Sequence, residues 1–192
     1  MRPAISSKPS KKGQRATASG SKPKTRASVI LSRVAESFAE LLLQTLREQL
    51  ISVVLFGSVA RGEARIKSDV DLLVVVKAPT EADLIGLREQ ITELCLDFEA
   101  RPDLLALADQ GFPAVIRQIV YSETEARRTH LFYLDLAVDG QILFDRHRFF
   151  ANKLARVHQR MAELGTRRQY LTRRRWVWLL KPGMQPGETI EL

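Results

Sequence analysis

Two short apolar runs near the middle of the chain constrain its fold more than any other feature. Residues 52–56 read Ser-Val-Val-Leu-Phe and stop at Gly57, and residues 69–77 read Asp-Val-Asp-Leu-Leu-Val-Val-Val-Lys. β-branched and aromatic residues in runs of this length are typical of buried strands. The loop of about a dozen residues between them leaves parallel and antiparallel pairing both open. The two runs therefore predict a sheet at the centre of the fold.

Helical patterns flank these two strands. Apolar residues recur every four positions from Val34 to Leu50, and Pro79-Thr80 opens a second helix over about 81–97. Further along, the sequence predicts a strand over 101–108, helices near 113–120 and 123–138, a strand over 141–144 and a helix over 147–164. Residues 166–192 predict a short hairpin before a Pro/Gly-rich end. The predicted class is α/β, a small mixed sheet flanked by helices with a C-terminal helical extension.

The positive charge of the chain is concentrated at its N-terminus. Of the 30 Lys and Arg residues, eight lie in residues 1–28, so the other 22 balance the 22 Asp and Glu residues. Residues 1–28 hold almost no large apolar groups and predict a disordered basic tail. We expect a folded domain over 29–145, followed by a C-terminal helix and an Arg/Trp-rich segment packed on it over 146–192. The pI near 10.0 therefore describes the tail and does not indicate nucleic-acid binding by the domain.

Other sequence features narrow the setting of the protein. No stretch reaches the roughly 18 apolar residues that a membrane helix needs. The basic N-terminus is not followed by an apolar segment, as a secretory signal would be. The single cysteine, Cys95, lies between two leucines and is expected to be a small buried hydrophobe. These features favour a cytoplasmic protein without a membrane partner.

An acidic pair begins the second predicted strand. Asp69 and Asp71 are two positions apart in an extended run, so both side chains leave the same face while Val70 and Leu72 face the core. Two adjacent carboxylates repel each other unless a cation lies between them, and hard oxygen ligands suit Mg²⁺. An isolated Asp-x-Asp is more often simply exposed at a strand start, so the pair alone does not identify a metal site.

A Gly-Ser dipeptide ends the first predicted strand. Gly57 has no Cβ, which lets a phosphate approach the backbone, and Ser58 adds a hydroxyl donor. If Val59 to Arg61 begin a helical turn, its N–H groups also point toward an anion. Alone, the dipeptide is equally consistent with an ordinary turn. Its position ten residues before the acidic pair is what makes it informative.

The complete pattern, Gly57-Ser58, ten residues, then Asp69-Val70-Asp71, resembles the minimal nucleotidyltransferases of the DNA polymerase beta superfamily. The resemblance implies the polymerase-beta-like nucleotidyltransferase fold and a Mg²⁺-dependent transfer of a nucleoside monophosphate to a hydroxyl acceptor. It implies Asp69 and Asp71 as metal ligands for two ions during turnover. It also implies a triphosphate, expected to be ATP, held by Gly57, Ser58, Arg61 and Ser68.

The same resemblance implies a third carboxylate on a neighbouring strand. Asp103, before the apolar run 104–107, is the first candidate, and Glu99 is the second. Asp103 is equally well explained as a turn residue after Pro102. The sequence departs from many relatives at Val59, where they carry Arg, and Arg61 or Lys67 either compensates or is simply solvated.

Three functions remain open at this level. Minimal members of the family often act as antitoxins that modify a HEPN-type toxin, which makes a protein acceptor the first choice. A non-catalytic nucleotide-binding module is the second. The third is a nucleic-acid-binding protein that acts through the basic tail and the Arg/Trp-rich segment 167–178.

Overall fold

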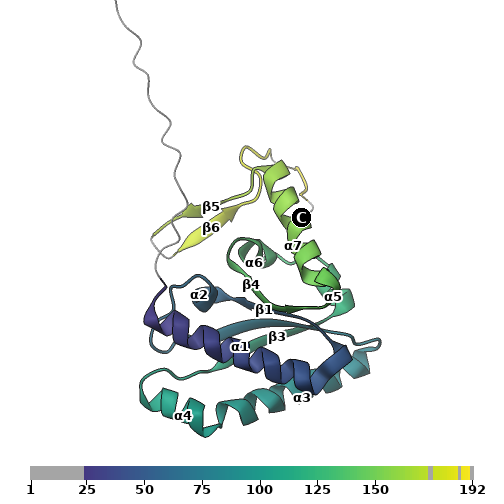
Figure 1. Cartoon of the computed structure of the whole chain (residues 1–192). Helices are drawn as coiled ribbons and strands as arrows, with labels where there is room; N and C mark the ends of the chain where they lie inside the picture. Colours follow the sequence, from purple (N-terminus) through teal and green to yellow (C-terminus); the bar gives the residue numbers. More distant parts are fainter. Residues whose placement is uncertain (1–23, 173–174, 186, 191–192) are drawn as a thin grey trace, which may run out of the picture.

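The computed structural model describes residues 24–172, 175–185 and 187–190 (Figure 1). The disordered tail expected at the N-terminus falls mostly outside the described residues. The last three residues of this expected tail, 26–28, form the first turn of α1 (Arg26–Leu46). Thr25 caps this helix by accepting a hydrogen bond from the Ser28 N–H, and Ser28 is fully buried.

A four-stranded mixed sheet forms the centre of the domain, as predicted. Its strands are β1 (Leu50–Phe56), β2 (Val70–Val76), β3 (Ile116–Ser122) and β4 (Gln141–Asp145), in the order β3-β2-β1-β4. β1 pairs antiparallel with β2 and β4, whereas β2 and β3 are parallel. The pairing that the sequence left open between the first two strands is therefore antiparallel.

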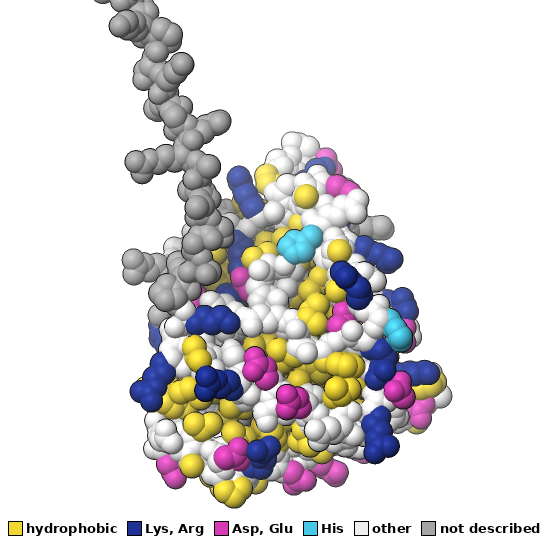
Figure 2. Space-filling model, in the orientation of Figure 1, with side chains coloured by type: hydrophobic (Ala, Val, Ile, Leu, Met, Phe, Trp, Pro, Cys, Tyr) yellow, Lys and Arg dark blue, Asp and Glu magenta, His cyan; other side chains and the backbone are white. Residues whose placement is uncertain are grey.

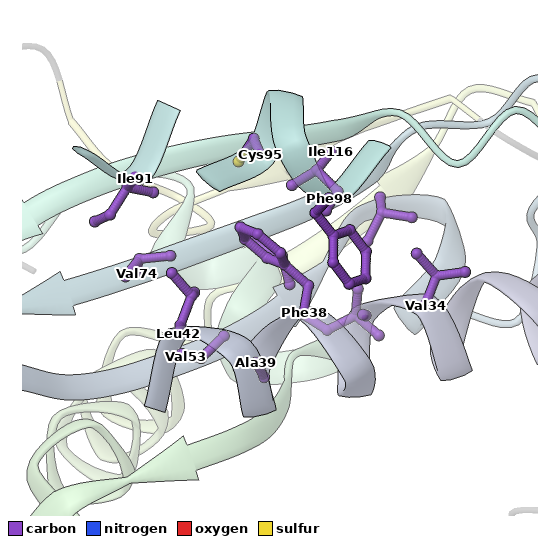
Figure 3. Packing of buried hydrophobic residues seen from close by; sticks show 14 of the residues in the cluster. Val34, Phe38, Ala39, Leu42, Val53, Val74, Ile91, Cys95, Phe98 and Ile116 are labelled. Atoms are coloured by element: carbon purple, nitrogen blue, oxygen red, sulfur yellow. The ribbon is translucent and has the colours of Figure 1, made fainter. Parts of the chain in front are cut away.

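One face of the sheet is covered by α1, by α3 (Glu81–Glu99) and by α4 (Pro102–Asp109). The four-residue repeat of α1 places Val34, Phe38 and Leu42 against the strands. The Phe38 ring packs on Phe98 of α3 with centroids 5.1 Å apart (Figure 3). This packing between α1, α3 and the sheet forms the larger of two apolar cores.

The opposite face is covered by three later helices. These are α5 (Glu123–Arg127), α6 (Tyr133–Asp139) and α7 (Phe149–Leu164), with α7 following the short helical turn η2 (Arg146–Arg148). Tyr133 and Phe150 are fully buried and meet edge to face at 5.3 Å. The strands are thus buried on both faces. Within the described residues, no helix combines the length and the apolar character needed to cross a membrane.

Three predicted elements differ from the structure. The strand predicted over 101–108 is replaced by α4, which begins at Pro102 because proline is suited to the first helical turn, where its missing N–H costs nothing. The helix predicted near 113–120 is instead β3, whose backbone pairs with β2 over its whole length. The helix predicted over 123–138 is divided into α5 and α6. Only for β3 does pairing with a distant segment override the local apolar pattern.

The C-terminal hairpin is present as β5 (Arg167–Tyr170) and β6 (Trp176–Leu179). The Arg168 side chain of this hairpin is only 8% exposed. Arg168 forms ion pairs with Asp135 and Asp139 of α6, each at 2.6 Å, and lies between the rings of Trp176 and Trp178. The hairpin is therefore anchored to α6 by a buried guanidinium.

We expect the substitution Phe38→Ala to lower the free energy of unfolding by about 3–5 kcal/mol, because it removes a fully buried ring and leaves a cavity against Phe98. Leu105→Ala is the control, since Leu105 is 53% exposed and should change stability by less than about 0.5 kcal/mol. Urea denaturation of both variants measures the difference. Equal losses would contradict the assignment of Phe38 to the main core.

Candidate active site

The end of β1 lies next to the start of β2, where these two central strands of the sheet terminate. Phe56 lies opposite Asp71 in the antiparallel register, so Gly57 comes directly against the Asp71 side chain. A Cβ on Gly57 would lie 2.0 Å from Asp71 Oδ2, and Gly57 has φ +72°. Both the close approach and the left-handed backbone require glycine at this position. The backbone that follows β1 therefore packs directly against the Asp71 carboxylate of β2.

Gly57 begins a single helical turn, α2 (Gly57–Ala60). The loop then closes on this turn, because the Arg61 N–H donates to the Gly57 carbonyl at 3.2 Å and the Glu63 N–H donates to the Ser58 carbonyl at 2.9 Å. The first N–H groups of such a turn have no partner within it. Together with the Ser58 hydroxyl, they can donate hydrogen bonds to a phosphate placed beside Asp71.

The loop that joins α2 to β2 is fixed from outside by the start of α1. The Thr25 hydroxyl donates to the Ala64 carbonyl at 2.8 Å, and the Ala64 N–H donates to the Ser28 hydroxyl at 2.9 Å. The Thr25 N–H also donates to the Gly62 carbonyl at 3.0 Å. The bond to the Ala64 N–H gives the buried Ser28 hydroxyl a partner, and the three bonds together hold the loop in place beside the acidic pair.

Asp71 lies on β2 and Asp69 directly precedes this strand; their side chains line the same depression, while Val70 and Leu72 are fully buried in the opposite core. Burial raises the pKa of Asp71 above its ordinary value, and the neighbouring Asp69 carboxylate raises it further. The positive charge of Arg61 lowers this pKa by a smaller amount. A divalent cation between the two carboxylates would remove their repulsion, so this pair fits Mg²⁺.

The acidic pair lines a depression of about 590 Å³ at the edge of the sheet. Its floor and walls come from the ends of β1, β2 and β3 and comprise Phe56, Asp69, Asp71, Ile116, Arg117, Gln118 and Ile119. The depression lies on the face of the sheet that carries α5, α6 and α7, because Phe56 and Ile119 pack against that core. A ligand can reach both carboxylates from solvent here.

Neither candidate for a third carboxylate reaches this depression. Asp103 lies on α4, is 59% exposed and pairs with Arg101 at 2.9 Å. Glu99 lies at the end of α3, where its Oε1 accepts a hydrogen bond from the Ile116 N–H at 2.7 Å. Among the described residues, no group of three or more His, Cys, Asp or Glu side chains could hold a metal ion. Asp103 is thus not part of the acidic site.

Arg117 takes the position on β3 beside the acidic pair. It stands opposite Asp71 in the parallel register, and its Nε lies 3.3 Å from Asp69 Oδ2. The two side chains are 68% and 40% exposed, so we assign this ion pair only about 0.2–1 kcal/mol. Sequence reasoning missed Arg117 because it assigned residues 113–120 to a helix. A strand over 116–122 would have placed Arg117 on the same face as Asp71.

The remaining predicted nucleotide-binding residues lie around the loop. The Arg61 guanidinium lies 4.9 Å from the Trp176 ring and 3.6 Å from the Glu63 carboxylate, yet its charge still acts on Asp71. The Ser68 hydroxyl accepts from the Arg65 N–H at 2.9 Å and so shapes the turn before Asp69. Neither residue lines the depression that holds the acidic pair.

Comparison with known proteins identifies the family of this chain. Residues 31–158 match the family model described as a nucleotidyltransferase domain. A curated protein of Methanocaldococcus jannaschii, provisionally named a protein adenylyltransferase, is 46% identical over 48 residues. That match covers 25% of this chain and 33% of the relative, so the chain spans about a third of the relative's length.

Solved structures with a similar arrangement are more distant in sequence. One, described as a toxin-antitoxin with AMP-PNP, is 20% identical and has a TM-score of 0.40, covering 68% of this chain and 92% of its own. Another, provisionally named a nucleotidyltransferase from Sulfolobus solfataricus, is also 20% identical. It has a TM-score of 0.38 and covers 64% of this chain and 86% of its own.

We expect Gly57→Ala to lower the free energy of unfolding by about 1–3 kcal/mol, because the new Cβ is strained at positive φ and collides with Asp71. Gly86→Ala is the matched control. A Cβ on Gly86 meets nothing within 4 Å in the middle of α3, so alanine there should stabilise the fold by about 0.5–1 kcal/mol. Thermal and urea unfolding measure both. A neutral Gly57→Ala would contradict the close approach.

The pKa of Asp71 gives a pH-dependent expectation. Because folding raises this pKa, the folded state binds the proton more tightly, and stability is lost as pH rises through the folded pKa. In a chelating buffer, Asp71→Asn should therefore be more stable than the wild type at pH 7. The two should converge as the pH falls below 3.8, the ordinary aspartate value.

Asp103→Asn is the control for this measurement. The hydrogen bond from Arg101 lowers the pKa of Asp103, so its charged form favours folding above the ordinary aspartate pKa. Its replacement should bring no gain in stability at pH 7. A gain equal to that of Asp71→Asn would show that a change in overall charge, and not the environment of Asp71, is responsible.

Proposed function

The chain belongs to the nucleotidyltransferase domain family, and we propose that it transfers AMP from ATP to a hydroxyl group with Mg²⁺ held by Asp69 and Asp71. The observation that carries this proposal is the contact between Gly57 and the Asp71 carboxylate. It brings a turn that can bind phosphate and a pair that can bind a cation to one place. A metal–triphosphate complex needs both groups there at once.

The chemistry follows from this placement. The acceptor oxygen forms a bond to the α-phosphorus and gives up its proton to solvent water, the bond from that phosphorus to the bridging oxygen breaks, and pyrophosphate leaves with the electron pair. The N–H groups of α2 and the Ser58 hydroxyl hold the outer phosphates and keep the leaving group in line with the acceptor. A bound cation supplies positive charge that neutralises the phosphate oxygens. Asp69 and Asp71 orient that cation from one side of the depression.

For the acceptor we propose a hydroxyl group on a partner protein. The curated relative from M. jannaschii carries the provisional name of a protein adenylyltransferase, which favours both ATP as donor and a protein as acceptor. The sequence resemblance to minimal nucleotidyltransferases implies an antitoxin-like role with a HEPN-type toxin as that partner. The nucleic-acid alternative is less favoured, because Arg168 of the hairpin is buried in ion pairs with α6.

We expect label from [α-³²P]ATP to appear on a protein acceptor when the chain is incubated with Mg²⁺ and a lysate of its source cells. Asp69→Asn and Asp71→Asn should each lower transfer by at least about 100-fold, because each removes a cation ligand. Asp97→Asn, on an exposed position of α3, is the control and should transfer normally. Equal labelling by wild type and both site variants would reject the proposed function.

A further inference from the structure

A positive side chain, Arg117, takes the place on β3 beside the acidic pair, a place that neither Asp103 nor Glu99 reaches. β2 and β3 run parallel, and Arg117 is the β3 residue opposite Asp71. Neighbouring strands lie about 4.8 Å apart, so the two backbones are adjacent at this point. Ile116 and Val120 face the core under α1 and α3, which leaves Arg117 on the same face as the acidic pair.

From this arrangement we propose that the site binds one divalent cation and that Arg117 supplies the second positive centre by binding the α-phosphate of the nucleotide. The inference rests on the proposed function. It replaces the two ions implied by the sequence resemblance with one ion and one guanidinium. Arg117 would then be a catalytic residue, since it would touch the phosphate at which the bonds change.

Charge balance favours one cation over two. Three carboxylates with two divalent cations carry one net positive charge. Two carboxylates, Arg117 and one divalent cation carry the same net charge. A second cation would add two further positive charges next to a fixed guanidinium, and like charges at such short range repel strongly. The side chains present thus match a site with a single ion.

The ion pair between Arg117 and Asp69 fits the proposal that a guanidinium takes the place of a second cation. Its two atoms, Arg117 Nε and Asp69 Oδ2, are 3.3 Å apart, and both side chains are substantially exposed. An exposed pair is screened by water and is easily broken. When a cation binds Asp69, the guanidinium can turn toward the phosphate without leaving a buried charge. A guanidinium can donate two parallel hydrogen bonds to phosphate oxygens, which suits this role better than an ammonium group would.

The proton of the acceptor has a defined route under this proposal. The acceptor oxygen bonds to the α-phosphorus and pyrophosphate departs, while the hydroxyl proton passes to solvent water in the open depression. Neither Asp103 nor Glu99 is placed to take it, since one pairs with Arg101 and the other accepts from the Ile116 N–H. Arg117 meanwhile stabilises the charge on the α-phosphate oxygens.

The test is a count of bound cations. Mn²⁺ is titrated into the full chain with and without the non-hydrolysable analogue α,β-methylene-ATP, and bound ions are counted by electron paramagnetic resonance. With the analogue, we expect one Mn²⁺ per chain in the wild type and two in Arg117→Asp, which restores a third carboxylate. Two ions in the wild type would overturn the inference and leave the proposed function standing. No binding of Mn²⁺ with the analogue would overturn both.

Arg117→Ala separates a catalytic role from a structural one. Without nucleotide it should bind Mn²⁺ about 2–5-fold more tightly, because Arg117 no longer competes for Asp69. It should bind the Mn²⁺ complex of the analogue about 10-fold or more weakly, because the phosphate contact is lost. Arg101→Ala breaks a comparable exposed Arg–Asp pair and should change neither affinity. Wild-type affinity for the complex in Arg117→Ala would overturn the proposal.

Discussion

The contact between the Gly57 backbone and the Asp71 carboxylate governs how this molecule is built. It exists because β1 and β2 are antiparallel and because Phe56 stands opposite Asp71, so the strand that ends and the strand that begins share one edge of the sheet. The loop between them must leave Gly57, turn once as α2 and return within a few residues. The bonds from the start of α1 to the Ala64 backbone hold that loop. The first turn of α1, with Thr25 and the buried Ser28, therefore helps to fix the loop next to the acidic pair.

This geometry opposes the stability of the fold. Asp71 is half-buried and close to Asp69, and both conditions raise its pKa, so folding disfavours the charged form of Asp71 that would bind a cation. Arg61 and Arg117 offset part of this, because their charges lower the same pKa. The two apolar cores on either side of the sheet, where Phe38 and Tyr133 are fully buried, offset this loss of folding stability. A site that needs a cation is expected to be strained without one.

The sequence was informative where local pattern decides structure. The apolar runs predicted β1 and β2, the four-residue repeat predicted α1, and the spacing from Gly57 to Asp71 predicted two groups that do meet. It failed where pairing between distant segments decides. Residues 116–122 mix charged, polar and apolar side chains, and only their register with β2 makes them a strand. Asp103 was predicted as the third carboxylate because a strand was expected over 101–108, and the helix expected near 113–120 gave no indication that Arg117 lies beside the acidic pair. Strand register is a property of two segments together, so no pattern within one of them reveals it.

The C-terminal hairpin connects to the site through a chain of aromatic and guanidinium contacts. Arg168 anchors the hairpin to α6, and Trp176 lies against both the Arg168 and the Arg61 guanidinium, at 4.6 and 4.9 Å. Arg61 directly follows α2, and its charge acts on Asp71. Trp176 thereby holds Arg61 on the hairpin side of the loop, whereas Arg117 approaches the carboxylates from β3. The acidic pair lies between one arginine fixed by an aromatic ring and one held only by an exposed ion pair. Of the two side chains, Arg117 is 68% exposed and Arg61 only 22%, which is why we propose Arg117 as the arginine that follows the charge of a bound nucleotide.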